Sequence, residues 1–127
     1  MNVIDHATQG LEVWREGVAT HMRTSALTQT HQLCIFEQFC DPGLGAPIHI
    51  HAVEEVLEVI EGRAELVLGD ESGIVTANQS VVIPAGMRHG FTNVGDGILK
   101  VRATLAAAIF EASYDDRREL SRRYSPP

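Results

Sequence analysis

The stretch that decides the fold is Gly43–Gly62, which reads GLGAPIHIHAVEEVLEVIEG. It places His49 and His51 two residues apart and ahead of Glu55. Side chains two residues apart lie on the same face of a β-strand, so the two imidazoles are expected to project together. If the strand continues, Glu55 lies on that face as well, whereas Glu54 has the opposite parity.

A third histidine occurs in a second stretch, Pro84–Asn93, which reads PAGMRHGFTN. His89 lies in a segment that is expected to form another strand, so three imidazoles and one carboxylate can converge. Imidazole suits iron, nickel, copper and zinc, and a carboxylate also permits manganese. The sequence therefore predicts one divalent transition-metal ion per chain, of the set Fe, Mn, Ni, Cu or Zn.

Written as spacings, the two stretches are G-x5-H-x-H-x3-E-x6-G and P-x-G-x2-H-x3-N. They closely resemble the two conserved motifs of the cupin superfamily. The resemblance implies an all-β double-stranded β-helix, or jelly-roll barrel, of the kind found in small single-domain bacterial cupins. Residues 1–127 would form one domain, with motif 1 at 43–62, motif 2 at 78–93 and a polar C-terminal tail at 113–127. The implied metal ligands are His49, His51, Glu55 and His89.

One position departs from the family pattern. The second motif usually begins with a glycine six residues before its proline, and Asn78 stands there. Asparagine tolerates left-handed backbone better than other non-glycine residues, so we expect the turn to be kept. The remaining motif positions are interpreted as turn residues without chemistry: Gly43, Gly62, Pro84, Gly86 and Asn93.

Similar small cupins point alternate residues of the strand before motif 1, and of the last long strand, into the barrel. That pattern, carried onto this chain, places five side chains around the metal: Phe36, Gln38, Phe91, Val101 and Ala103. For each of them, an ordinary place in the barrel core is the alternative. Because the set is mainly apolar, it favours a small hydrophobic or aromatic ligand over a sugar phosphate.

Four protein ligands leave one or two positions of an octahedral metal open. The resemblance then implies three possible functions. The first is dioxygenase-type oxidation of a small apolar or aromatic substrate that chelates the metal through oxygen. The second is redox-neutral isomerase, decarboxylase or lyase chemistry, with Glu55 as a possible base. The third is ligand binding without turnover. We favour the first.

The rest of the chain is rich in strand signals. Nine short segments between residues 11 and 105 carry β-branched or aromatic residues and are separated by Gly, Pro, Asn and Asp, which predicts a sandwich or closed barrel. Charges three and four residues apart over 115–123 indicate a short polar helix or a frayed tail. Because sheet edges need cover, we expect a homodimer, with the strands around 11–27 contributing.

The amino-acid composition indicates which classes of binding partner are to be expected. Ten Lys and Arg against 17 Asp and Glu give a formal net charge of −7, so nucleic acid and anionic membrane surfaces are poor partners and a small molecule is the expected one. No apolar run approaches the roughly 20 residues that span a bilayer, and a cytoplasmic location is the default expectation. Cys34 and Cys40 lie too far apart on one expected strand to form a disulfide. His21 and Arg23 could line the rim of the barrel. Trp14 is expected to be a packing anchor, with a platform for a substrate as the alternative.

Overall fold

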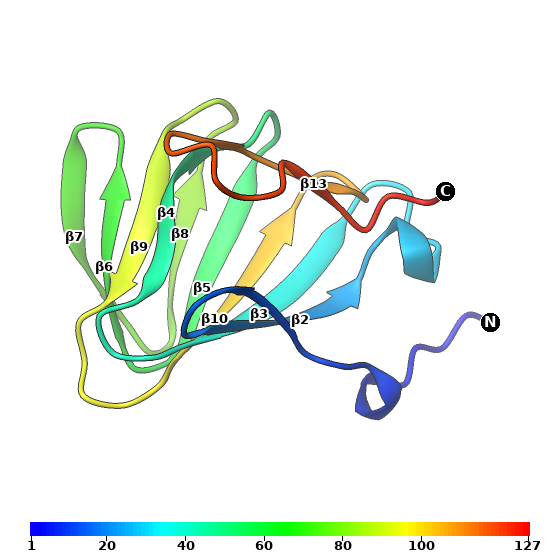
Figure 1. Cartoon of the computed structure of the whole chain (residues 1–127), viewed down its shortest axis with the longest axis horizontal. Coiled ribbons are helices and arrows are strands. Elements are labelled where there is room, and N and C mark those ends of the chain that lie inside the picture. The colour runs from blue at the N-terminus through cyan, green and yellow to red at the C-terminus, as the bar shows by residue number, and fades with distance from the viewer.

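The computed structural model of the protein describes residues 1–127 and is built almost entirely of antiparallel strands (Figure 1). Helix is confined to two short 3-10 turns, η1 (His6–Thr8) and η2 (Ala26–Thr28). The strands are β1 (Glu12–Arg15), β2 (Val18–Thr24), β3 (Cys34–Cys40), β4 (Gly45–Ile50), β5 (Glu55–Glu61), β6 (Arg63–Leu68), β7 (Glu71–Thr76), β8 (Gln79–Ile83), β9 (His89–Asn93), β10 (Leu99–Leu105), β11 (Phe110–Glu111), β12 (Ser113–Tyr114) and β13 (Arg122–Arg123).

Two sheets face each other and enclose the core. One sheet has the strand order β1-β2-β3-β10-β5-β8, the other has the order β12-β4-β9-β6-β7, and β11 pairs only with β13. This confirms the expected all-β jelly roll. β2 ends at Thr24 rather than continuing to Leu27, because the hydroxyl of Ser25 accepts a hydrogen bond from the Leu27 amide and caps η2.

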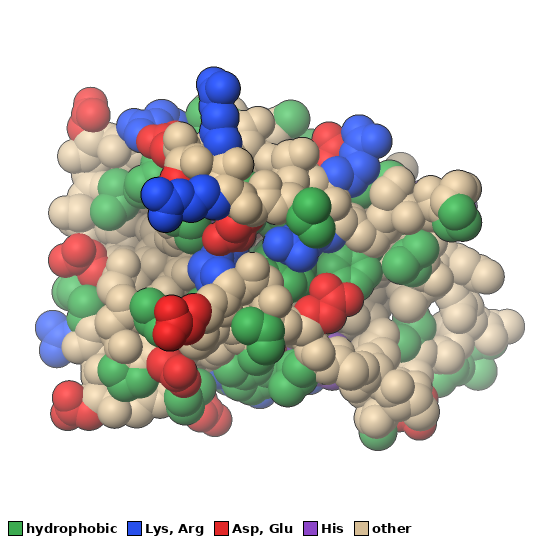
Figure 2. Space-filling view, viewed as in Figure 1, with side chains coloured by type: hydrophobic (Ala, Val, Ile, Leu, Met, Phe, Trp, Pro, Cys, Tyr) green, Lys and Arg blue, Asp and Glu red, His purple; other side chains and the backbone are tan.

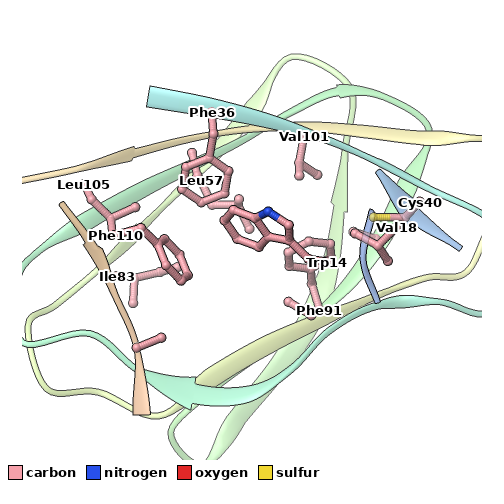
Figure 3. Close-up of a cluster of buried hydrophobic side chains, with 14 of the residues drawn as sticks. Trp14, Val18, Phe36, Cys40, Leu57, Ile83, Phe91, Val101, Leu105 and Phe110 are labelled. Carbon is pink, nitrogen blue, oxygen red and sulfur yellow. The ribbon is translucent and has the colours of Figure 1, made fainter. Parts of the chain in front are cut away.

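The core lies between the sheets and is centred on Trp14. Its indole projects among Phe36, Phe91 and Phe110 (Figure 3), with ring centroids 5.6 Å from Phe36 and 4.8 Å from Phe110. The packing role that the sequence predicted for Trp14 is therefore confirmed. Both cysteines, Cys34 and Cys40, are buried and free. Burial raises the pKa of each thiol to about 12, so both are unreactive near neutral pH.

The turns between strands follow the motif positions. Asn78 has φ 68°, the left-handed conformation that the substitution for glycine was expected to keep. Asn93 is buried, and its side-chain amide donates to the carbonyls of Cys40 (2.9 Å) and Gly97 (2.8 Å), while its oxygen accepts from the Gly95 amide. It therefore fastens the turn after β9. None of the helices has the length and apolar character needed to cross a bilayer.

The segment after β12 does not form the polar helix that the charge pattern suggested. Arg122 and Arg123 form β13 and pair with Glu111 and Phe110 of β11. Glu119 forms an ion pair with Arg15, and the Arg123 guanidinium lies 4.2 Å from the Trp14 ring centroid. The charges in this segment pair with the rest of the fold rather than with one another along a helix.

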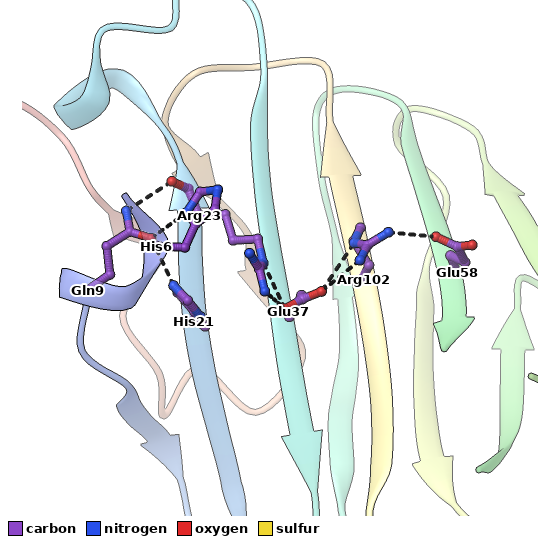
Figure 4. A network of polar contacts seen from close by, with 7 residues as sticks. All are labelled: His6, Gln9, His21, Arg23, Glu37, Glu58 and Arg102. Atoms are coloured by element: carbon purple, nitrogen blue, oxygen red, sulfur yellow. Dashed lines mark hydrogen bonds and ion pairs between the residues drawn. The ribbon is translucent and has the colours of Figure 1, made fainter. Parts of the chain in front are cut away.

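The outer face of the larger sheet carries a buried charge network (Figure 4). The carboxylate of Glu37 on β3 is fully buried and forms ion pairs with Arg23 of β2 (2.6 Å) and Arg102 of β10 (2.9 Å). Burial alone would raise the pKa of Glu37, but the two guanidinium groups outweigh it and lower the pKa below its ordinary value. His21 and Arg23 thus lie on the outer face, so the hypothesis that they line the barrel rim is wrong.

Glu37→Gln is expected to reduce the free energy of unfolding at pH 7 by about 1–2 kcal/mol, since both arginines are partly exposed and can be solvated. Because folding lowers the pKa of Glu37, its ionised carboxylate stabilises the folded state fully above the pKa that it has in the unfolded chain. This stabilisation is lost as the pH falls through the lower pKa that it has in the folded chain. Urea titrations at pH 7 and pH 3 should therefore show a difference that shrinks in acid. Glu58→Gln, which loses a partly exposed contact of 3.4 Å to Arg102, is the control and should change stability little. Equal losses for Glu37→Gln at both pH values would contradict this account.

Candidate metal centre

Four side chains from both sheets converge at one end of the barrel. His49 on β4 and His89 on β9 are direct neighbours across the smaller sheet, and His51 follows immediately after β4. Glu55 is the first residue of β5 and comes from the larger sheet. The expectation that Glu55 shares a strand with the histidines is wrong, because β4 ends at Ile50 and the chain crosses between the sheets before β5. Glu55 still faces inward, and Glu54 is exposed.

Backbone carbonyls fix the tautomer of each imidazole. A carbonyl oxygen can only accept, so each Nδ1–H donates: His49 to Pro47 (2.7 Å), His51 to Glu111 (2.6 Å) and His89 to Met87 (2.8 Å). The Nε2 atoms of His51 and His89 lie 3.3 and 3.0 Å from Oε1 of Glu55. The four ligand atoms all lie within 4.8 Å of one another, and all four residues are buried.

Electrostatics hold His49 and Glu55 in the protonation states that a metal requires. Burial, with the neighbouring His89 and His51, lowers the pKa of His49 to about 3. Burial would raise the pKa of Glu55, but hydrogen bonds and charge from His51 and His89 outweigh it and lower the pKa to about 2. His89 is also subject to burial, which acts to lower its pKa, but the hydrogen bond and charge of Glu55 dominate and raise it. Near neutral pH the carboxylate is ionised and His49 is neutral.

The residues fit a divalent transition metal. With every Nδ1–H committed to a carbonyl, a neutral imidazole presents only an Nε2 lone pair to the centre of the cluster. Lone pairs facing an ionised carboxylate need a positive charge between them, supplied by either a proton or a metal ion. Three imidazole nitrogens and one carboxylate oxygen are a donor set for Mn, Fe, Ni, Cu or Zn, and the hydrogen bonds to Nδ1 are the outer contacts that orient such ligands.

A cavity adjoins the four side chains. Of the five residues expected around the metal, Phe36, Gln38, Phe91 and Ala103 line this cavity. Val101 does not line it: this residue is buried farther along β10, on the side of the core near Cys40 (Figure 3). The amide of Gln38 donates to the hydroxyl of Thr20 at 3.0 Å and is thereby oriented.

Four further lining residues could not be expected from the strand pattern: Trp14, Arg15, Phe110 and Tyr114. The register between β1 and β2 shifts between Val13 and Arg15, and this bulge breaks the alternation so that Trp14 and Arg15 both reach the cavity. Phe110 and Tyr114 come from β11 and β12, beyond the segments that strand signals identified. The residue types around Trp14 and Arg15 give no sign of this bulge.

Fold and site together define a cupin-type barrel with a candidate metal centre at its mouth. A family model for the cupin domain, Cupin_2, matches residues 36–106, and the chain belongs to this family. Among curated proteins, polyketide synthase CurC of Streptomyces cyaneus is 45% identical over 56 residues, which are 43% of this chain and 36% of that protein. Mannose-1-phosphate guanylyltransferase 2 of Escherichia coli O157:H7 is 40% identical over 53 residues, 42% of this chain and 11% of that protein. The match thus spans well under half of either relative.

Solved structures share the fold at low sequence identity. The polyketide cyclase RemF from Streptomyces resistomycificus is 21% identical with a TM-score of 0.72, covering 83% of this chain and 78% of that one. An RmlC-like cupin from Shewanella frigidimarina is 20% identical with a TM-score of 0.71, over 85% and 96%. Oxalate decarboxylase from Lactobacillus farciminis is 16% identical with a TM-score of 0.79, over 87% and 35%. These similarities establish the architecture of the chain.

Proposed function

We propose that the chain is a metal-dependent enzyme that holds one divalent transition ion on His49, His51, Glu55 and His89. The observation that carries the proposal is the buried cluster itself, with each imidazole held in one tautomer and the cluster facing an aromatic-lined cavity. We further propose oxygen-dependent, dioxygenase-type oxidation of a small apolar or aromatic substrate that ligates the metal through one or two oxygens.

When bound, such a metal supplies a Lewis-acidic and redox-active centre with open coordination positions. The chain supplies the rest. Phe36 and Phe91 offer apolar surface to the body of a substrate, and Gln38 can orient it through the amide that Thr20 holds. Glu55 is ionised near neutral pH and can accept a substrate proton if it loosens from the metal. The closed barrel excludes bulk water from the reacting atoms.

A redox-neutral reaction is the second candidate. Its specific support is the likeness to two polyketide proteins, the synthase CurC by sequence and the cyclase RemF by structure. Glu55 would take the α-proton of a polycarbonyl substrate, the enolate carbon would attack a second carbonyl carbon of the same molecule, and the proton would return to the new alkoxide oxygen. Both candidates need the same metal centre and differ in their need for dioxygen.

Oxygen electrode measurements separate the two candidates. Protein loaded in turn with Fe, Mn, Ni, Cu or Zn is screened against small phenols, catechols and diketones, in air and under argon. The proposal expects substrate-dependent oxygen uptake with at least one redox-active metal, and none with Zn. Equal product formation in air and under argon would contradict the proposed oxidation and support the redox-neutral reaction. No product under either atmosphere with any metal would contradict the enzymatic assignment and favour ligand binding.

Phe91→Leu is expected to change the ratio of kcat/KM between one-ring and two-ring phenols by about tenfold while metal content stays the same, since changes of one or two carbons in a hydrophobic pocket alter discrimination by about that factor. Phe91 is 7% exposed and lines the cavity. Steady-state kinetics with metal analysis of the same sample check the result. Phe39→Leu, on the outer face of β3, is the matched control, and an equal change of the ratio in both variants would argue against a pocket role.

A further inference from the structure

Arg15 is a cation in the wall of the cavity. Apart from the four residues of the metal centre, it is the only ionisable side chain of the lining with a permanent charge near neutral pH. Its Nη1 donates to the carbonyl of Gly45 at 3.2 Å, and its Nε and Nη2 both donate to the carboxylate of Glu119. The side chains of Arg15 and Glu119 are only 15% and 10% exposed. A carboxylate therefore already occupies the two parallel donors of this arginine.

The cavity as it stands has no room for a substrate. Its free volume is about 20 Å³, which accommodates roughly one water molecule. Phe110 and Tyr114 form part of its wall, and the chain continues from them into residues 115–124, which we call the closing segment. A ligand the size of an aromatic ring can enter only when part of this wall moves.

The closing segment is held mainly by polar contacts. Two residue pairs join β13 to β11, and Glu119 binds Arg15. Asp115 and Arg122 form exposed ion pairs with Arg88 and Glu111, and the backbone donates or accepts hydrogen bonds at Asp115 and Ser121. The Arg123 guanidinium and the Tyr124 ring lie against Trp14. Nε of Arg123 is buried without a hydrogen-bond partner. Residues 115–118 are exposed, and the segment crosses a face on which side chains of both charges are intermixed (Figures 1 and 2). Elements that are held mainly by exposed polar contacts open at lower cost than core strands.

We infer that Arg15 is a specificity-determining residue that binds a carboxylate of the substrate, and that Glu119 takes the place of this carboxylate in the closed chain. When a substrate displaces Glu119, one bidentate carboxylate on Arg15 replaces another. The balance between the closed chain and the substrate-bound chain therefore depends on the contacts of the substrate's apolar body with Trp14 and Phe36. Loss of Glu119 from Arg15 frees the closing segment. The inference rests on the proposed function, and it narrows the substrate class to small aromatic carboxylates.

The test uses benzoate and its neutral isostere benzamide as probes. Trp14 is the only tryptophan of the chain, so its fluorescence reports binding. Affinities are measured for the wild type and for Glu119→Gln, Arg15→Gln and Arg15→Lys, each with its metal content determined. Asp115→Asn is the matched control, because it removes an exposed ion pair of the same segment, with Arg88, and leaves Arg15 covered.

Glu119→Gln is expected to bind benzoate about tenfold more tightly than the wild type and Asp115→Asn, with little change for benzamide. Arg15→Gln should lose benzoate binding at least tenfold and keep benzamide, while Arg15→Lys should lie between Arg15→Gln and the wild type. If Glu119→Gln strengthens both probes equally, or neither, the inference is overturned. Because the probes can be titrated with and without metal, a chain that binds no metal but shows these differences refutes the proposed function and leaves the role of Arg15 intact.

Discussion

His51→Ala is expected to lower the metal content of the purified protein by at least tenfold, because it removes one of four ligands and leaves a gap in a buried cluster. Changes to groups that only orient a ligand already cost 10–100-fold in metal affinity. The His51 imidazole is 2% exposed and lies 3.3 Å from Glu55, inside the buried cluster. Elemental analysis of protein purified without chelators measures the result.

The same variant should separate the stability of the metal-loaded chain from that of the metal-free chain. A bound ligand adds RT ln(1 + [L]/Kd) to the free energy of unfolding, about 4 kcal/mol at a thousandfold excess over Kd. Added metal should therefore raise the melting temperature of the wild type and not that of His51→Ala. His31→Ala, an exposed histidine outside the cluster, is the control and should keep full metal. Equal metal in the wild type and His51→Ala would refute the ligand assignment.

Gly45→Ala is expected to destabilise the fold by about 3 kcal/mol or more. Gly45 is the first residue of β4 and pairs with Thr92 of β9. A β-carbon there would lie well inside van der Waals contact with the carbonyl oxygen of Phe91 and 2.9 Å from its carbonyl carbon. Backbone cannot rotate away as a side chain can, so β4 and β9 must separate.

That separation reaches the metal centre, because His49 and His89 lie opposite each other on the same two strands. Gly45→Ala should thus lose metal as well as stability, measured by denaturant titration and metal analysis of one preparation. Gly73→Ala is the matched control: it lies within β7, and an added β-carbon meets nothing within 4 Å. Comparable stability of the two variants would show that β4 and β9 can yield at little cost.

The sequence predicts the fold and the composition of the cluster well, because both depend on local spacing. The pair His49 and His51 with a carboxylate four residues later is a contiguous pattern, and turn residues such as Asn78 carry their own conformational preference. Glu55 was preferred to Glu54 because it would share a face with His49 and His51 on one continuous strand, but no such continuous strand exists. Inward orientation follows from its own strand, where Glu55, Leu57 and Val59 alternate with outward residues.

What the sequence does not predict depends on irregularities and long-range pairing. The bulge that turns both Trp14 and Arg15 inward has no signature in the residue types. The ion pair between Arg15 and Glu119 joins residues 104 positions apart, so the local charge pattern near Glu119 suggested a helix instead. Val101 points to the inner face of its strand as expected, but it lies too far along the barrel to reach the cavity. Alternation along a strand predicts the face of the sheet on which a side chain lies and does not predict its position along the barrel.

His51 takes its orientation from outside its own sheet. Its Nδ1–H donates to the carbonyl of Glu111, and β11, which contains Glu111, is the strand that pairs with β13. A metal ion on this cluster and the seated closing segment would therefore be linked, and linkage is reciprocal: whatever factor the seated segment adds to metal affinity, the metal adds to the seating of the segment. Under the proposed exchange at Arg15, a substrate that displaces Glu119 would loosen both together. The proposal thus implies that the chain holds a metal most firmly without substrate and exchanges it most readily during turnover.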